Sequence, residues 1–283
     1  ANVGNTMIGK DSFQEIDIAG VTMPITKHNF IVKDIKDIAP TLRRAFKIAK
    51  SGRPGPVLVD FTKDVTAPAN KYEYTPVKPE EIAPVTDTIR EEDLDEAVSY
   101  ICESKKPYIF VGGGAIISDC EDELARFVEL TGAPVCDSLM GKGAYDGRKD
   151  NYTGMLGMHG TKTSNFGVSK CDLLVVVGAR FSDRVTGNTQ KFATNAKILQ
   201  IDIDAAEVNK NIKTDASIIG DAKEILKRLN AKLEKADIAD KSEWMNEIKE
   251  SMKQYPLTYN QEGLTGPYVI EQIYNETNGD AII

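Results

Sequence analysis

Three charged residues follow a short β-branched run and could bind an anion. The run covers residues 173–177 (LLVVV), and Arg180, Asp183 and Arg184 come shortly after it. Arginine binds phosphate through paired, charge-assisted hydrogen bonds, so two arginines close to a strand end suit a diphosphate. A solvated cluster of salt bridges is the alternative. The pattern favours an anion-binding site beside this run.

Two aspartates stand at the end of the next apolar run, ILQIDID at 198–204. Carboxylates at the ends of such strands commonly accept hydrogen bonds from ribose hydroxyls, and we predict this role for Asp202. Asp204 is the better candidate for a helix N-cap, because Asp is a preferred residue at that position. The two runs together indicate a nucleotide site beyond the carboxyl ends of parallel strands.

A glycine triplet at 112–114 follows a predicted strand at 107–111. It resembles half of a dinucleotide-binding fingerprint, but Ile117 occupies the position of the third glycine. Asp137, after the next strand, stands roughly where a ribose-binding acid would be. An NAD site is therefore one interpretation, and a plain tight turn explains the triplet equally well.

The chain has two histidines and four scattered cysteines. The segment GMHGT at 157–161 leads into a predicted helix with Thr161 as its N-cap, so we interpret His159 as a cofactor contact rather than a general base. No nucleophile elbow, HExxH or CxxC pattern is present, and the sequence predicts no metal site. The cysteines are interpreted as free thiols in a reducing compartment.

Strands alternate with helices across the middle of the chain. Such alternation predicts an α/β fold with a doubly wound, Rossmann-like parallel sheet of about five or six strands. We expect strands at 107–111, 134–136, 173–177, 198–203 and 217–219, and helices at 91–104, 120–131 and 222–233.

Shorter α/β pieces flank this central part. A helix at 38–49 and a strand at 57–61 need partners, which we expect upstream of the first residue. Trp244 begins an apolar helical pattern that predicts a connecting helix packed on a neighbouring domain. The predicted division of the chain is 1–64, a proline-rich linker at 65–88, the central domain at 89–235, a connecting segment at 236–265, and the start of another domain at 266–283.

Composition narrows the class of partner. The 283 residues are 41% hydrophobic and 28% charged, with a net charge of -8, which argues against nucleic acid and anionic membranes. No apolar run of about 18 residues and no signal-peptide pattern is visible, so we expect a cytoplasmic protein. Both ends look internal to a longer protein, and we interpret the chain as a fragment.

Several segments resemble one family, the large catalytic subunit of acetolactate synthase, also called acetohydroxyacid synthase. The resemblance covers nearly the whole chain, and the combination of segments is specific. They are IGKDSFQE at 8–15, ITKHNF at 25–30, SGRPGPVLVDFTKDV at 51–65, GMLGMHGT at 154–161, GARFSDRVTG at 178–187 and ILQIDIDAAEVNKN at 198–211.

This resemblance implies an activity. Family members use thiamine diphosphate and Mg²⁺ to condense two pyruvates, or pyruvate and 2-oxobutanoate, to 2-acetolactate or 2-aceto-2-hydroxybutanoate in branched-chain amino acid (isoleucine and valine) biosynthesis, with release of CO₂. They bind FAD without a net redox role. The resemblance implies 2-oxo acid substrates, a homodimer or higher homo-oligomer, and a possible regulatory small subunit. Residues 1–64 would end a pyrimidine-binding domain, 89–235 would bind FAD, and 266–283 would begin a diphosphate-binding domain.

Site residues follow from the resemblance position by position. The implied FAD contacts are Arg53, Gly112, Gly113, Ser138, Leu139, Met140, Gly157, Met158, His159, Gly178, Ala179, Arg180, Asp183, Arg184, Asp202, Ile203, Asp221 and Ala222. The implied substrate-channel residues are Phe13, Gln14, Lys63, Met158, Asp183 and Arg184.

The sequence also departs from the family pattern. Gly4 stands where many members have Pro, and Ser182 where many have Asp. The glutamate that activates thiamine would lie upstream and the magnesium diphosphate motif downstream, so we expect no catalytic residue in the chain and no activity of the fragment alone. Alternatives are another thiamine diphosphate enzyme, such as pyruvate oxidase or glyoxylate carboligase, an NAD-binding oxidoreductase or NAD-dependent deacylase, and a nucleotide-sensing domain without catalysis.

Overall fold

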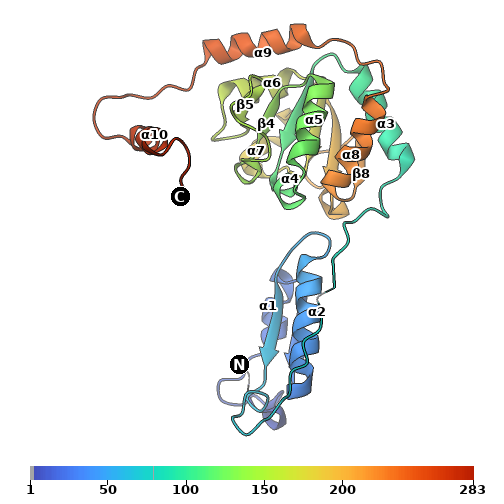
Figure 1. Ribbon diagram of the computed structural model, residues 1–283, viewed down its shortest axis with the longest axis vertical. Coiled ribbons are helices and arrows are strands. Elements are labelled where there is room, and N and C mark those ends of the chain that lie inside the picture. Colours follow the sequence, from blue (N-terminus) through green and yellow to red (C-terminus); the bar gives the residue numbers. More distant parts are fainter. Residues whose placement is uncertain (1–2, 79) are drawn as a thin grey trace.

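A six-stranded parallel sheet forms the centre of the computed structural model, which describes residues 3–78 and 80–283 (Figure 1). Ala1, Asn2 and Pro79, the last within the expected linker, lie outside the described residues. The strand order is β5-β4-β3-β6-β7-β8, which confirms the predicted doubly wound α/β fold. The strands are β3 (Pro107–Val111), β4 (Val135–Asp137), β5 (Tyr152–Met155), β6 (Leu173–Val177), β7 (Lys197–Asp202) and β8 (Ala216–Ile219).

Helices cover both faces of this sheet. Neighbouring residues of β3 and β6 are buried in different clusters, as expected from the alternation of side chains along a strand. One face packs against α3 (Glu91–Glu103), α5 (Glu121–Thr131) and α8 (Ala222–Leu233). The other face packs against α6 (Lys162–Lys170) and α9 (Ser242–Gln254). Short α4 (Gly113–Ile117) and α7 (Asp183–Thr186) follow β3 and β6.

Helix α9, in the expected connecting segment, packs on the sheet of the central domain that precedes it in the chain. Trp244 is buried, and its indole Nε1 donates to the carbonyl oxygen of Pro107 at 2.9 Å. Its ring meets Tyr108 edge to face, with the centroids 6.5 Å apart. A parallel sheet must be covered on both faces, and α6 alone is too short to cover the second one.

A second, smaller unit precedes the central one. It contains α1 (Ile18–Thr22), α2 (Ile38–Lys50) and the parallel strands β1 (His28–Val32) and β2 (Val57–Phe61). The expectation that β2 would find its partner only upstream of the chain is wrong, because β1 pairs with it. We call residues 3–64 the first unit and the six-stranded sheet with its helices the central unit.

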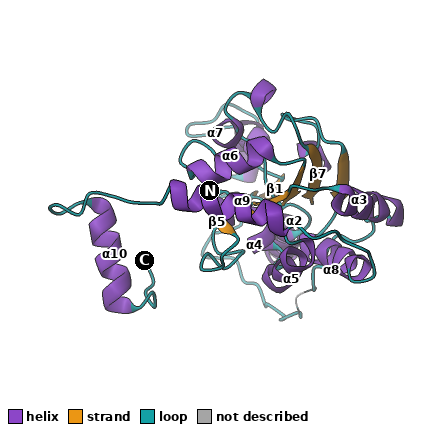
Figure 2. Ribbon diagram, turned by 90° about the horizontal axis from the view of Figure 1, so that it is seen from above, coloured by secondary structure: helices purple, strands orange, loops and turns teal. Residues whose placement is uncertain are grey.

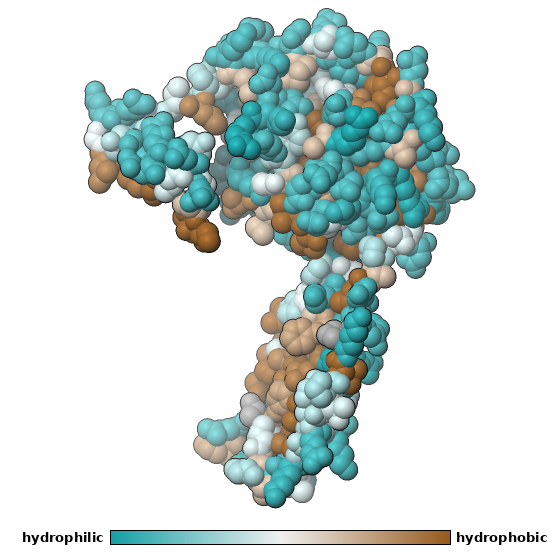
Figure 3. Space-filling view, viewed as in Figure 1, coloured by the Kyte–Doolittle hydropathy of each residue, from teal (hydrophilic) through white to brown (hydrophobic). Residues whose placement is uncertain are grey.

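The first unit carries much apolar surface (Figure 3). Phe13, Ile25 and Phe46 are each more than half exposed. Helix α10 (Gly266–Thr277) lies apart from the central unit at the end of an extended segment (Figures 1 and 2). Within residues 3–78 and 80–283, no helix has the length and apolar character needed to cross a membrane. The 3-10 helices are Asn5–Met7, Met23–Ile25, Ile35–Asp37, Leu139–Gly141, Thr189–Lys191 and Ala205–Glu207.

Candidate functional site

A cavity of about 640 Å³ opens at the carboxyl ends of the central strands. From β3 the chain builds the sheet outward through β4 and β5, and then returns to the other side of β3 with β6. The order of strands therefore reverses between β3 and β6. In open α/β sheets this switch point leaves a crevice where ligands bind.

Glycines bring the two turns at the switch point into backbone contact. Gly112 N–H donates to the carbonyl oxygen of Val177, and Gly114 N–H donates to that of Gly178, both at 2.9 Å. A Cβ atom on Gly178 would lie 2.6 Å from the Cα of Gly114. The triplet is thus explained by close packing of two turns, and Ile117, in place of a third glycine, lines the cavity.

Three arginines border the cavity: Arg53, Arg180 and Arg184. Arg184 Nη1 lies 3.6 Å from the sulfur of Met158, and its Nε lies 4.0 Å from Asp183. Within the described parts of the chain, the guanidinium of Arg180 has no ion pair or hydrogen bond. Its donors are therefore free for an anionic ligand.

The two aspartates after β7 differ in their surroundings. Asp202 is 8% exposed and lines the cavity, and burial raises the pKa of its carboxyl group. One of its oxygens accepts a hydrogen bond from the N–H of Asp204 at 3.0 Å. Asp204 accepts from the N–H of Ala206 as the predicted N-cap. A hydrogen bond from Arg53 lowers the pKa of Asp204.

The turn that carries His159 is held from two sides. Thr161 is the predicted N-cap of α6, and its hydroxyl oxygen accepts from Ser164 N–H at 2.9 Å. Met158 N–H donates to the carbonyl oxygen of Arg184 at 2.9 Å. His159 lines the cavity at the end of this fixed turn.

Most of the predicted cofactor contacts meet at the cavity. Those that line it are Arg53, Gly113, Ser138, Leu139, Met140, His159, Gly178, Ala179, Arg180, Arg184, Asp202, Ile203, Asp221 and Ala222. Four others lie beside it without lining it, and they are Gly112, Gly157, Met158 and Asp183. Of the predicted channel residues, Phe13, Gln14 and Lys63 belong to the first unit and do not line this cavity.

Asp137 faces away from the cavity, contrary to the ribose-binding role considered for it with NAD. Tyr152 donates its hydroxyl hydrogen to Asp137 at 2.8 Å, and Lys142 Nζ lies 3.6 Å from the other oxygen. Asp137, Tyr152 and Lys142 border a separate groove beside α5. Burial, followed by the hydrogen bond to Asp137, raises the pKa of Tyr152.

The sequence analysis did not predict the remaining residues that line the cavity as cofactor contacts, although it noted Gly114, Ile117 and Ser182 for other reasons. These remaining residues are Pro54, Gly114, Ile117, Ser118, Met155, Leu156, Ser182, Val185, Ile201 and Glu207. Most adjoin predicted residues along the chain. Glu207 had one available signal, because it stands three residues after the N-cap Asp204, where a carboxylate is common.

The family model described as thiamine pyrophosphate enzyme, central domain, matches residues 94–229. The chain carries the central domain of the thiamine pyrophosphate enzyme family. The matched residues run from α3 into α8 and include all six strands of the central sheet. The cavity therefore lies within a thiamine pyrophosphate enzyme central domain, apart from Arg53 and Pro54, which the first unit supplies.

Several relatives of this chain are acetolactate synthase large subunits. The chain is 46% identical over 260 residues (89% of the chain, 43% of the relative) to the probable acetolactate synthase large subunit of Methanocaldococcus jannaschii. It is 42% identical over 286 residues (99% and 46%) to that of Corynebacterium glutamicum. For Haemophilus influenzae the identity is 38% over 288 residues (99% and 50%). The chain thus spans half or less of the length of these relatives.

Proposed function

We propose that the chain is part of an acetolactate synthase large subunit and that its switch-point cavity binds FAD. Similarity to such subunits along nearly the whole chain supports the assignment to acetolactate synthase. The assignment of FAD rests on the cavity itself, with the unpaired Arg180 and the buried Asp202 on its wall. Its volume is within the range of about 300–1,000 Å³ usual for small-molecule sites.

The residues around the cavity fit a dinucleotide. Gly113 and Gly178 line the cavity, so a diphosphate would lie against the backbone of these two turns. Arg180 would bind the diphosphate through its free donors, and Arg184 would add a second positive charge. Asp202 would accept from ribose hydroxyls, with Asp221 beside it at the start of α8.

The flavin end would lie near the apolar side chains of Leu139 and Met140. Both are more than two-thirds exposed and line the cavity, so a planar ring placed on them would remove apolar surface from water. His159, on the opposite turn, would contact the ring or its chain. FAD would stay bound without a net redox role, as the family resemblance implies.

The activity of the whole protein is part of the same proposal. It would join two 2-oxo acids with thiamine diphosphate and Mg²⁺ bound outside this chain, and the chain alone would be inactive. Residues 1–64, 89–235 and 266–283 would belong to the pyrimidine-binding, FAD-binding and diphosphate-binding domains. Phe13, Gln14 and Lys63 would border the substrate channel in an assembled homo-oligomer, with or without a regulatory small subunit.

Product analysis of the full-length protein tests this activity. With pyruvate, thiamine diphosphate, Mg²⁺ and FAD, we expect 2-acetolactate and CO₂. A parallel reaction with added 2-oxobutanoate should also give 2-aceto-2-hydroxybutanoate. Acetyl phosphate as the sole product, formed only when phosphate and oxygen are supplied, would contradict the proposal and point to a pyruvate oxidase.

A further inference from the structure

Arg53 reaches from the first unit to the cavity of the central unit. It lies in the turn between α2 and β2, more than 150 residues before its partners in the sequence. Its Nη1 donates to Asp204 at 2.9 Å and to Glu207 at 2.7 Å. These two carboxylates follow β7, so the contact joins the two units at the edge of the cavity.

Glu207 is the better shielded of the two carboxylates. Its side chain is 7% exposed, compared with 29% for Asp204. Burial by itself raises the pKa of Glu207, but hydrogen bonds from Arg53 and Lys210 outweigh it, so the net pKa is lowered. Glu207 is therefore ionised at neutral pH, and removing its charge would leave Arg53 with one weaker, more exposed partner.

The bonds to the two carboxylates leave part of the guanidinium free. Both use Nη1, and within the described residues Nε and Nη2 of Arg53 have no partner. Because the guanidinium is planar and rigid, fixing Nη1 also fixes the direction of the remaining donors. Arg53 lines the cavity, so these donors are available to a ligand there.

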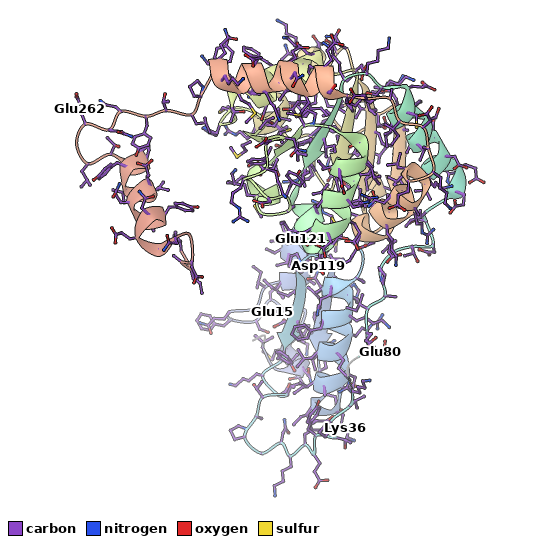
Figure 4. The ribbon with its side chains drawn as sticks, turned by 45° about the horizontal axis from the view of Figure 1, so that its top comes forward. Glu15, Lys36, Glu80, Asp119, Glu121 and Glu262 are labelled. Atoms are coloured by element: carbon purple, nitrogen blue, oxygen red, sulfur yellow. The ribbon has the colours of Figure 1, made fainter. Side chains whose placement is uncertain are left out.

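The linker after β2 is extended and contacts both units. Its Glu80 pairs with Lys47 of α2, whereas its Val85 and Thr88 hydrogen-bond to Asp221 and Ile219 of the central unit. Figure 4 shows the linker, marked by Glu80, alongside the first unit, which points away from the central sheet. A side chain that is both a contact between units and a wall of the cavity can couple the two.

We infer that Glu207 is a positioning residue: with Asp204 it holds Arg53 of the first unit at the cavity, so that binding of an anionic dinucleotide and docking of the two units stabilise each other. The dinucleotide rests on the proposed function, whereas the effect on docking does not. Such coupling is reciprocal, because each event must favour the other by the same free energy.

The test compares Glu207→Gln with a matched control in the 283-residue chain. The control is Glu234→Gln, which removes one of two carboxylates from Arg126 within the central unit, away from the cavity. We expect Glu207→Gln to weaken FAD binding by about five- to tenfold, at the lower end of usual coupling strengths. We also expect small-angle X-ray scattering to show a larger radius of gyration without FAD. Glu234→Gln should change neither.

Asp204→Asn is a second variant, for use if Glu207→Gln does not fold. Asn is also a preferred N-cap residue, so this change removes the charge that faces Arg53 and keeps the cap. Unchanged scattering in the folded variants would overturn the inference. If the wild type binds FAD, an unchanged FAD affinity of the variants would also overturn it. If the wild type binds no FAD, the proposed function fails. The scattering without ligand then still decides whether Glu207 and Asp204 hold the units together.

Discussion

Replacing Arg180 with alanine is expected to weaken FAD binding by about 10- to 100-fold. A hydrogen bond to a charged group contributes about 1.5–3 kcal/mol, and each 1.4 kcal/mol changes affinity tenfold. Arg180 is the cavity arginine whose guanidinium has no partner within the described residues, so its donors can all be directed to the diphosphate. The measurement is a flavin fluorescence titration of the chain at fixed salt concentration.

The matched control is Arg148→Ala. Arg148 is an exposed arginine paired with Asp146 in the groove beside α5, away from the switch point. Arg148→Ala removes the same charge from the chain, and the FAD affinity of this variant should match that of the wild type. Equal weakening by both substitutions would show a general effect of charge, and no weakening by Arg180→Ala would contradict its assigned role.

The second large effect is expected for Gly178→Ala, which should lower the free energy of unfolding by about 2–5 kcal/mol. Its φ is +57°, and a left-handed conformation costs a residue with a Cβ about 1–2 kcal/mol. The new Cβ would also lie 2.6 Å from the Cα of Gly114 and 2.8 Å from the N of Ala115. Because both are backbone atoms, relief requires β3 and β6 to separate at the switch point, and overpacking of this kind costs about 1–3 kcal/mol.

Urea unfolding followed by circular dichroism measures this change. Gly132→Ala is the control, since Gly132 has a φ of +62° but the nearest atom to its Cβ would be 3.5 Å away, on Lys241. This control should lose only about 1–2 kcal/mol. If the two variants lose the same stability, the close approach of the two turns does not matter.

The elements that the sequence predicted best are buried in the central unit. The strands at 107–111 and 173–177 and the helix at 222–233 begin and end at the predicted residues. Fully buried parallel strands consist of uninterrupted apolar runs bounded by turn residues, and this pattern is local in the sequence. Prediction therefore succeeded for these strands because burial on both faces selects every side chain, and for the helix because one apolar face at helical spacing packs on the sheet.

Two strands were not predicted, for different physical reasons. β1 starts with His28 and Asn29 and is partly exposed, so it lacks a continuous apolar run. β5 is an edge strand that contains Gly154, and glycine is depleted in strands. β1 pairs with β2, and β5 pairs with β4. The backbone hydrogen bonds to these neighbours form the two strands, and the side-chain pattern of β1 and β5 does not predict this pairing.

The candidate site was predictable where it depends on strand ends. Carboxyl ends of parallel strands meet at one edge, so residues after β3, β6 and β7 come together although they are far apart in sequence. The orientation of Asp137 could also have been predicted from the sequence. Side chains alternate along β4, so Asp137 lies on the same face of the sheet as Val135, toward α5. The pairing of Arg53 with Glu207 depends on how two units dock, and nothing local in either segment indicates it.

The most direct test of the account is a titration of the 283-residue chain with FAD and, separately, with NAD. After desalting, we expect the chain to retain FAD, seen in the flavin absorbance, and NAD neither to bind nor to displace it. Retention of NAD without any affinity for FAD would contradict the assignment of the cavity and favour an oxidoreductase domain. Binding of neither dinucleotide would show that the residues at this switch point do not by themselves form the proposed site.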